Sequence, residues 1–129
     1  MGPTAEVERL AASTYVSLTT FKKAGTAVPT PVWVSSDGDL LYVWTQGDSG
    51  KAKRIRNDGH VLVAPSDSRG GLQGAAVEGR ARVLDSPADL SRVAALHRAK
   101  YGLQFRLFDL GAKLFRRNRP LVAIEIALG

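Results

Sequence analysis

The chain has 129 residues, of which 44% are hydrophobic and 23% charged, the balance of one soluble globular domain, and we expect residues 1–129 to form it. No run of about 18 apolar residues is present, so no integral membrane association is expected. Cysteine is absent, which excludes disulfides, thiolate metal sites and a cysteine nucleophile. The N-terminal residues do not form a signal segment, so a cytoplasmic location is the expectation.

Basic residues outnumber acidic ones by 18 to 12, which gives a formal net charge of +6. This surplus favours an anionic partner: a nucleic acid, an anionic lipid surface or a phosphorylated small molecule. A platform for single-stranded nucleic acid needs exposed aromatic residues between its basic ones. Here the basic residues concentrate in residues 51–56, without such aromatic residues. We therefore expect no nucleic-acid partner.

The first part of the chain reads as a short helix followed by strands. An amphipathic helix is expected over residues 4–12, and a strand over Tyr15–Phe21, which is rich in β-branched and aromatic residues. Pro29 and Pro31 lack the N–H that a strand ladder needs. The first half of residues 28–35 is therefore expected to be an edge strand or irregular.

A hairpin is expected around the turn pair Asp37-Gly38. This pair separates the apolar runs 32–34 and 40–44, so we predict that these two runs pair with each other.

The second half of the chain mixes strands with inserted helices. Ser86 and Pro87 mark the start of a helix that ends at Gly102, because serine caps helices and proline favours the first helical position. The other expected elements are a loop and short helix (47–57), a buried strand (60–64), an exposed loop (66–74), a half-buried strand (75–84), a helix (105–119) and a final strand (Leu121–Leu128). The sequence thus predicts a mainly β (α+β) fold: a six-stranded antiparallel barrel with inserted helices.

The most specific local signal is a basic segment at the expected start of the short helix. If Ser49 caps this helix, Lys51, Lys53 and Arg54 lie in or just beyond its first turn. Cations are disfavoured there and anions bind, because the helix dipole is positive at that end and the backbone N–H groups of Gly50 and Lys51 are free to donate. A bound phosphate would resolve this conflict. The alternative is a solvated basic face without a ligand.

Other constellations carry less chemistry. The stretch Gly47-Asp48-Ser49-Gly50 is similar to the nucleophile loop of chymotrypsin-like proteases, but those enzymes need a histidine earlier in the chain, and the first here is His60. His60 and His97 are the only histidines, and the carboxylates are scattered without metal-ligand spacing. We therefore expect neither a metal site nor a catalytic acid–base residue.

The order of these features resembles the pyridoxamine-phosphate-oxidase-like split β-barrel flavoproteins, which have an FMN-binding-type barrel. Within them, the chain is most similar to the deazaflavin-dependent oxidoreductases that use coenzyme F-420. Three stretches carry the resemblance: Thr30-Pro31-Val32-Trp33-Val34 with Asp37-Gly38; Leu41-Tyr42-Val43-Trp44-Thr45 with Ser49, Lys51, Lys53 and Arg54; and Ala64-Pro65-Ser66-Asp67 with Arg69-Gly70.

The resemblance implies a homodimer with two cofactor sites at the subunit interface. Residues implied in cofactor phosphate binding are Thr45, Ser49, Gly50, Lys51, Lys53 and Arg54. Pro31, Val32 and Trp33 are implied along the tricyclic ring, and Arg69 is implied as a further contact. One departure concerns the Ser-Arg-Lys of true pyridoxamine phosphate oxidases, where this chain has Ser49-Gly50-Lys51. Those oxidases also carry an arginine and a lysine on the strand where residues 31–34 stand here. These departures weaken an FMN-dependent oxidase and leave room for a longer, more acidic cofactor.

The function implied is an oxidoreductase that transfers a hydride from reduced coenzyme F-420 to a small unsaturated or quinone-like substrate. The lack of an acid–base constellation is compatible with this, because the cofactor carries the chemistry. The alternatives are an FMN- or haem-binding protein on the same barrel and a non-catalytic cofactor carrier. A nucleic-acid-binding small barrel that uses the same basic helix is a further alternative, which the focused charge disfavours.

Overall fold

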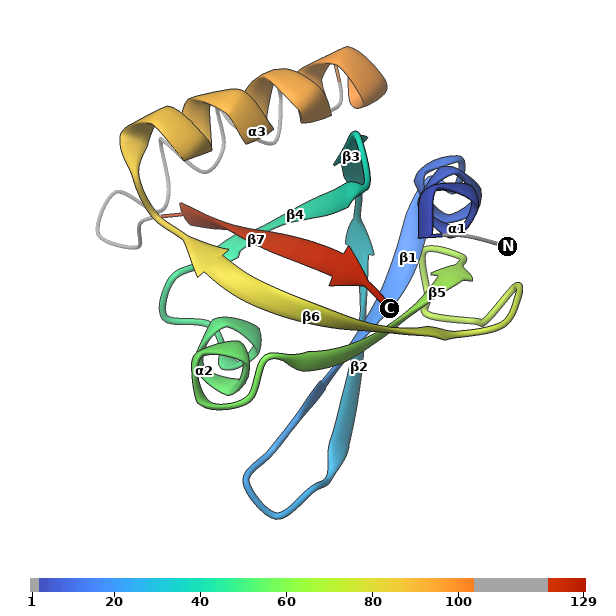
Figure 1. The fold of residues 1–129 in the computed structure, drawn as a ribbon, viewed down its shortest axis with the longest axis vertical. Helices are drawn as coiled ribbons and strands as arrows, with labels where there is room; N and C mark the ends of the chain where they lie inside the picture. The colour runs from blue at the N-terminus through green and yellow to red at the C-terminus, as the bar shows by residue number, and fades with distance from the viewer. Residues whose placement is uncertain (1–2, 104–120) are drawn as a thin grey trace.

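A computed structural model of the chain describes residues 3–103 and 121–129 (Figure 1). Its elements, in chain order, are α1 (Pro3–Ala11), β1 (Tyr15–Phe21), β2 (Ala27–Trp33), β3 (Ser35–Asp37), β4 (Leu40–Gln46), α2 (Gly50–Asn57), β5 (His60–Ser66), β6 (Val77–Leu84), α3 (Pro87–Tyr101) and β7 (Leu121–Leu128). No helix in these two ranges is long and apolar enough to cross a membrane.

The strands form one curled antiparallel sheet in the order β2-β1-β5-β6-β7-β4-β3. Its two edge strands, β2 and β3, are consecutive in the chain and are separated only by Val34. A sheet whose opposite edges are joined by one residue must curl until those edges meet. This connection makes the sheet a split barrel, which Figure 1 shows with β2, β3 and β4 meeting on one side.

The described sheet has seven strands rather than the predicted six, because the expected hairpin is built differently. Residues 32–34 do not pair with residues 40–44. Instead β2 pairs with β1 along its whole length, and the short strand β3 pairs with β4, with Asp37 opposite Leu40. The two residues between them are Gly38 and Asp39, and Gly38 has φ +61°, which suits the first position of a type II′ turn. Thus the turn signal was right, but the strand before it was wrong.

Most other predicted elements are confirmed, with shifted boundaries. The buried strand β5 continues to Ser66, two residues beyond the prediction, and β6 starts at Val77 rather than at residue 75. The proline-containing segment is the edge strand β2, as expected. Ser86 caps α3, accepting from Asp89 N, and Gly102 follows the end of the helix. The predicted helix over 105–119 lies outside the described residues.

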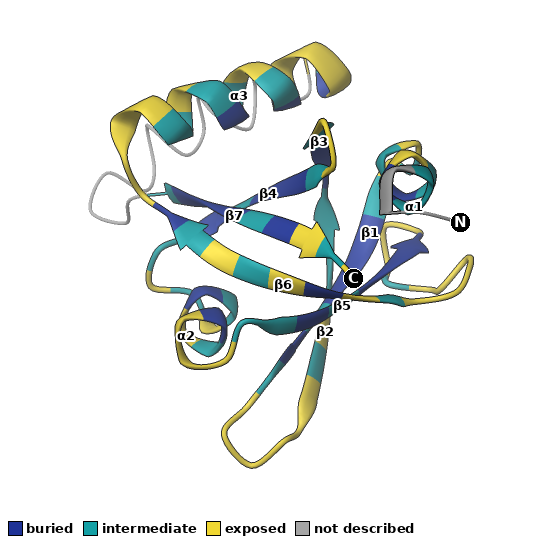
Figure 2. Cartoon of the chain, in the orientation of Figure 1, coloured by how far each residue is buried: buried dark blue, intermediate teal, exposed yellow. Residues whose placement is uncertain are grey.

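The core fills the inside of the curled sheet. Alternate residues of β1, such as Val16 and Leu18, are fully buried there, and each fully buried side chain of this type contributes about 1.5–3 kcal/mol. Two short helices add to the same cluster: α1 through Leu10 and α2 through Ile55. Figures 1 and 2 show α1 at the upper right of the curled sheet and α2 at its lower left, so the two helices close opposite ends of the same core. The end of β4 and the start of α2 are thereby fixed against the core.

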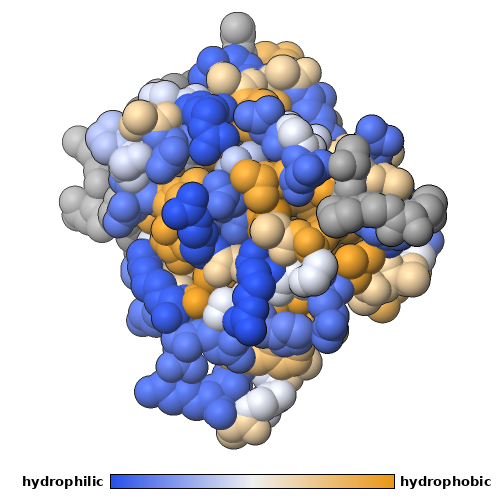
Figure 3. Space-filling view, in the orientation of Figure 1, coloured by the Kyte–Doolittle hydropathy of each residue, from blue (hydrophilic) through white to orange (hydrophobic). Residues whose placement is uncertain are grey.

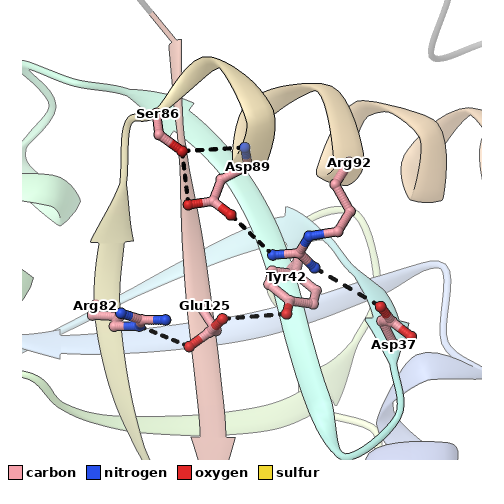
Figure 4. Close-up of polar contacts among 7 residues, drawn as sticks. All are labelled: Asp37, Tyr42, Arg82, Ser86, Asp89, Arg92 and Glu125. Carbon is pink, nitrogen blue, oxygen red and sulfur yellow. Dashed lines mark hydrogen bonds and ion pairs between the residues drawn. The ribbon is translucent and has the colours of Figure 1, made fainter.

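The long helix α3 covers the outer face of β4 and β7 (Figure 1). Polar contacts of Arg92 hold the helix there (Figure 4). Arg92 forms ion pairs with Asp89 on its own helix and with Asp37 at the end of β3. Its guanidinium also lies 4.8 Å from the centre of the Tyr42 ring. The Tyr42 hydroxyl in turn donates to Glu125 at 3.2 Å. These contacts of Arg92 and Tyr42 fix how α3 lies over β4.

The end of α3 is held where the chain passes from β2 to β3. Val34 N–H donates to the Tyr101 hydroxyl at 2.9 Å, and that hydroxyl lies 2.7 Å from the carbonyl of Thr14, to which it can donate. Val34 and Thr14 are the next opposing pair after Tyr15 and Trp33, so the hydroxyl takes the place of a β1–β2 ladder bond. Lys100 Nζ donates to the Val34 carbonyl at 2.7 Å. The Tyr101 hydroxyl therefore bridges β1 and β2 at the point where the two strands separate.

Candidate functional site

The start of α2 carries a capped, basic helix end. Ser49 Oγ accepts from Ala52 N at 3.1 Å and from Thr45 Oγ1 at 2.9 Å, which leaves the Ser49 O–H able to donate elsewhere. The backbone N–H groups of Gly50 and Lys51 belong to the first turn, which has no partners of its own within a helix. The first turn contains no acidic residue. The predicted cap is confirmed, and it gathers several hydrogen-bond donors.

Arg54 bends back towards this helix start. Its Nε donates to the buried Thr20 Oγ1 at 2.6 Å, and a Cβ placed on Gly50 would lie 2.6 Å from its Nη1. The guanidinium therefore fills the space that a side chain at position 50 would occupy. The chain has no arginine at position 50, but the guanidinium of Arg54, one helical turn later, occupies the same space.

The other cations of α2 differ in environment. Lys51 is partly buried, and this burial, together with the nearby charge of Arg54, lowers the pKa of its ammonium group. Lys53 is exposed, and Arg56 donates to the carbonyl of Gly47 at 2.7 Å. Lys51 and Arg54 are therefore two neighbouring cations, each partly removed from water, and an anion between them would relieve their repulsion. Figure 3 shows hydrophilic side chains over the region of α2 and the β1–β2 turn.

A seam lies between β2 and β4, because β2 pairs with β1 rather than with β4. The β3–β4 register sets Ser35 opposite Tyr42. Continued backwards along the chain, it sets Trp33 opposite Trp44 and Val32 opposite Thr45, but these residues belong to β2, which pairs with β1 instead. Along the seam between the two strands, the facing positions thus run from Trp33 and Trp44 to Val32 and Thr45, and Thr45 contacts Ser49 at the helix start.

A cavity of about 250 Å³ lies at the tryptophan end of this seam. Its lining is aromatic and aliphatic: Tyr15, Pro31, Val32, Trp33, Trp44 and His97. The Trp33 ring is stacked on Tyr101, with ring centres 4.5 Å apart and planes inclined by 11°. A planar, uncharged ring system is the ligand that such walls suit.

His97 is fully buried and belongs to the wall of this cavity. Its Nδ1 lies 2.8 Å from Ser35 Oγ, and desolvation by burial is the main cause that lowers its pKa to about 4. The imidazole is therefore neutral at pH 7, and none of the described residues that line the cavity carries a charge. His60 is partly exposed and stacks on Phe21.

Arg69 lies in the exposed loop after β5, which turns around Asp67. The Asp67 carboxylate accepts from the backbone N–H groups of Arg69 and Gly71, each at 2.8 Å. A Cβ on Gly70 would lie 3.8 Å from Pro31 Cδ, so this loop packs against β2. The third stretch of the resemblance is thus beside the first, whereas within the described residues no hydrogen bond or ion pair joins the Arg69 side chain to α2.

The structure therefore joins two of the predicted groups along one seam: Pro31, Val32 and Trp33 at one end, and Thr45, Ser49, Gly50, Lys51 and Arg54 at the other. Sequence reasoning missed Tyr15, Trp44, His97 and Tyr101 as parts of the cavity or its support. The helical spacing of His97 and Tyr101 placed them on the buried face of α3, but it gave no sign of which strands they would meet.

Comparison with known proteins places the fold. The chain is similar in structure to a conserved hypothetical protein from Mycobacterium tuberculosis (TM-score 0.73, 20% identity, 99% of this chain and 81% of the other). It is also similar to the haem storage protein HutZ from Vibrio cholerae (TM-score 0.69, 12% identity, 100% and 92%). A third similar structure is an F-420 reductase (TM-score 0.57, 17% identity, 95% and 92%). No curated protein matches the chain in sequence.

The sequence model of the pyridoxamine 5′-phosphate oxidase family matches residues 3–128, nearly the whole chain. The split-barrel fold agrees with that match. On this basis the chain belongs to the pyridoxamine 5′-phosphate oxidase family.

Proposed function

We propose that the protein is an oxidoreductase that uses the deazaflavin coenzyme F-420 and reduces a small unsaturated or quinone-like substrate. The observation that carries this proposal is the seam, which joins an uncharged aromatic cavity to a basic helix start. A cofactor with a planar ring and a phosphate-bearing side chain has this same division. The likeness to an F-420 reductase supports the choice of cofactor, and the family supports a flavin-type ring.

The anionic part of the cofactor would be held at α2. The Ser49 O–H and the N–H groups of Gly50 and Lys51 are uncharged donors, and the Lys51 ammonium and Arg54 guanidinium supply charge. Charge-assisted hydrogen bonds of this type contribute about 1.5–3 kcal/mol each. Lys53 is exposed next to them and would meet a longer acidic tail. Arg69, on the loop beside Pro31, is kept as a further contact of this proposal.

The ring would lie along Pro31, Val32 and Trp33, where it supplies hydride transfer as its own chemistry. The protein's part is to orient the ring between aromatic walls and to exclude water from one side of it. Among the described residues that line the cavity, His97 stays neutral because burial lowers its pKa to about 4. The proton that a reduced substrate needs would therefore come from solvent or from the substrate side of the cofactor.

FMN is the second candidate cofactor, because it shares the planar ring and the phosphate. The neutral β2 strand and the two cations of α2 favour the more acidic coenzyme. Haem is a third candidate, favoured only by the likeness to a haem storage protein. Part of the His97 imidazole is engaged, since its Nδ1 lies 2.8 Å from Ser35 Oγ. A non-catalytic carrier would bind the same cofactor without turnover.

A direct titration distinguishes these candidates. Trp33 and Trp44 line the cavity, so binding of a ring there should quench tryptophan fluorescence. We expect coenzyme F-420 to bind at least about tenfold more tightly than FMN, as one additional charge contact would require. Tighter binding of FMN, or of haem, would replace this proposal with the corresponding alternative.

The phosphate site is tested with Lys51→Ala. This change should weaken binding of coenzyme F-420 by roughly 1.5–3 kcal/mol, about 10–150-fold, because it removes one charge-assisted contact. The fold should keep its stability, since a cation leaves the positive end of a helix. Lys23→Ala, in the exposed β1–β2 turn, removes the same charge away from α2 and is the matched control. Equal losses in both variants would indicate only a diffuse basic surface.

A further inference from the structure

The open edge of β2 has an unusual hydrogen-bonding character. Pro29 and Pro31 pair with β1 opposite Thr19 and Ser17. Opposing residues in an antiparallel pair alternate between hydrogen-bonded and non-hydrogen-bonded positions, and a proline fits only the second kind, because it has no N–H. The backbone groups of residues 28, 30 and 32 therefore face β1, and those of residues 29, 31 and 33 face the open edge.

Two contacts further along the chain agree with this alternation. Val34 is an even-numbered residue, and its N–H is linked through the Tyr101 hydroxyl to Thr14, which lies at the start of β1. Trp33 is odd-numbered, and its backbone favours the charged form of the imidazole of His97, which belongs to the wall of the seam cavity. The backbone of Trp33 thus faces the seam, and by the alternation so does that of Pro31.

This edge offers acceptors without donors at both prolines. The carbonyl oxygens of Pro29 and Pro31 point outwards, and no N–H accompanies either of them. Within the described residues, no side-chain hydrogen bond reaches either carbonyl. Pro31 lies in the wall of the aromatic cavity, whereas Pro29 lines a separate hollow on the outer face of β1, β2 and β5.

We infer that the seam cavity selects a planar ring that carries an N–H donor on its edge, of the cyclic imide class, and that the Pro31 carbonyl accepts this hydrogen bond. The inference rests on the proposed function in that the imide edge is shared by deazaflavins and flavins. A ring whose edge carries only acceptors would face the Pro31 carbonyl with no donor between them, which disfavours its binding.

The first test compares each ring with a derivative that lacks this donor. FMN and a deazaflavin 5′-phosphate are each titrated beside the derivative in which the imide nitrogen is methylated. For the ring that binds, methylation should weaken binding by about tenfold or more, because the donor is lost in a site that excludes water. A methyl group also adds bulk, so a second measurement must observe the carbonyl itself.

That measurement uses protein labelled with carbon-13 at the carbonyl of its 6 prolines. The resonance missing from the Pro31→Ala variant identifies Pro31, and Pro87 at the start of α3 is the internal reference. Binding of the parent ring should move the Pro31 resonance downfield, as expected for a carbonyl that gains a hydrogen bond, and leave that of Pro87 in place. The methylated ring at saturating concentration should not produce this shift.

The outcomes separate the two proposals. Equal binding of parent and methylated rings, or a Pro31 resonance that does not move when the parent ring binds, overturns this inference and leaves the proposed function standing. Failure of both parent rings to bind overturns the proposed function and this inference with it. A selective loss together with the Pro31 shift supports both.

Discussion

At the scale of single residues, the contact between Gly50 and Arg54 carries a sharp prediction. In Gly50→Ala the new Cβ would lie 2.6 Å from Arg54 Nη1, so the guanidinium must move away from the helix start. Because it is the end of a flexible side chain, the free energy of unfolding should change by less than about 1 kcal/mol. Affinity for the phosphate-bearing cofactor should fall about tenfold in a fluorescence titration.

A double-mutant cycle supplies the control for Gly50→Ala. In the Arg54→Ala background, the added methyl group has no guanidinium to displace, so it should cause no further loss of affinity. Additive losses in the double variant would mean that Gly50 acts on binding without Arg54.

His97 predicts a pH dependence of stability. Its pKa is about 4 in the folded chain and about 6.5 when unfolded, mainly because burial disfavours the charged imidazolium. The unfolded chain therefore takes up a proton between pH 6.5 and 4 that the folded chain does not. The neutral imidazole costs nothing above pH 6.5, and stability falls as pH drops from there. From pH 7 to pH 5 the loss from this residue should be about 2 kcal/mol by urea unfolding.

His97→Gln isolates this effect from the titration of carboxylates. The variant should be less stable than wild type at pH 7, but its stability should fall less steeply between pH 7 and 5. The same slope in both proteins would show that His97 does not titrate differently in the folded state.

At the scale of elements, the Tyr101 hydroxyl that bridges β1 and β2 should stabilise the folded chain. Tyr101→Phe keeps the ring that stacks on Trp33 but leaves the Val34 N–H without its acceptor. The expected cost is about 1–3 kcal/mol of unfolding free energy, as for a buried unsatisfied group. Hydrogen exchange at the Val34 amide should also accelerate more than at amides in the middle of β1.

Tyr42→Phe is the matched control for Tyr101→Phe. It also removes one hydroxyl under α3, but that hydroxyl donates at 3.2 Å to Glu125, which keeps its ion pair with Arg82. Its cost should stay below about 1 kcal/mol. If Tyr101→Phe costs no more than Tyr42→Phe, the hydroxyl of Tyr101 does not support the strand switch.

The elements also show what the sequence could predict. Local signals were sufficient for the caps at Ser49 and Ser86 and for the turn at Gly38, because each depends on a few neighbouring residues. The switch at Val34 was missed, since residues 27–37 read as continuous extended chain and nothing local says that one part pairs with β1 and the next with β4. The candidate site likewise has one part that local signals predict and one part that they do not.

The basic helix start was visible as a charge pattern, but the aromatic cavity was not. It combines residues from four separate elements, namely Tyr15 on β1, Trp33 on β2, Trp44 on β4 and His97 on α3. Likewise, the return of Arg54 over Gly50 depends on Thr20, which is 34 residues earlier in the chain. Such contacts follow from the closed sheet rather than from any local pattern.

At the scale of the whole molecule, we expect a homodimer whose subunits meet on the outer face of β1, β2 and β5. This face has an apolar hollow of about 330 Å³, and Leu72 beside it is 65% exposed. An exposed apolar surface of this kind favours a partner. Light scattering should give twice the chain mass of 13.8 kDa at micromolar concentration. Leu72→Asp should shift the equilibrium towards monomer.

The control for this variant is Leu103→Asp, which changes an equally exposed leucine two residues after the end of α3, away from the β5–β6 loop that holds Leu72. Dissociation by Leu103→Asp alone would place the interface elsewhere. A wild-type monomer that still binds cofactor would contradict the dimer itself.

The two edges of the sheet have a consequence for aggregation. A growing fibre recruits chains by adding strands to an open edge, which must offer alternating donors and acceptors over several residues. The edge at β2 lacks donors at Pro29 and Pro31, and the edge at β3 is only 3 residues long. Neither edge is a good template for another chain. Replacing both prolines by threonine should restore the missing donors and shorten the lag time of thioflavin-detected fibre formation, without any change in the side chains that form the core.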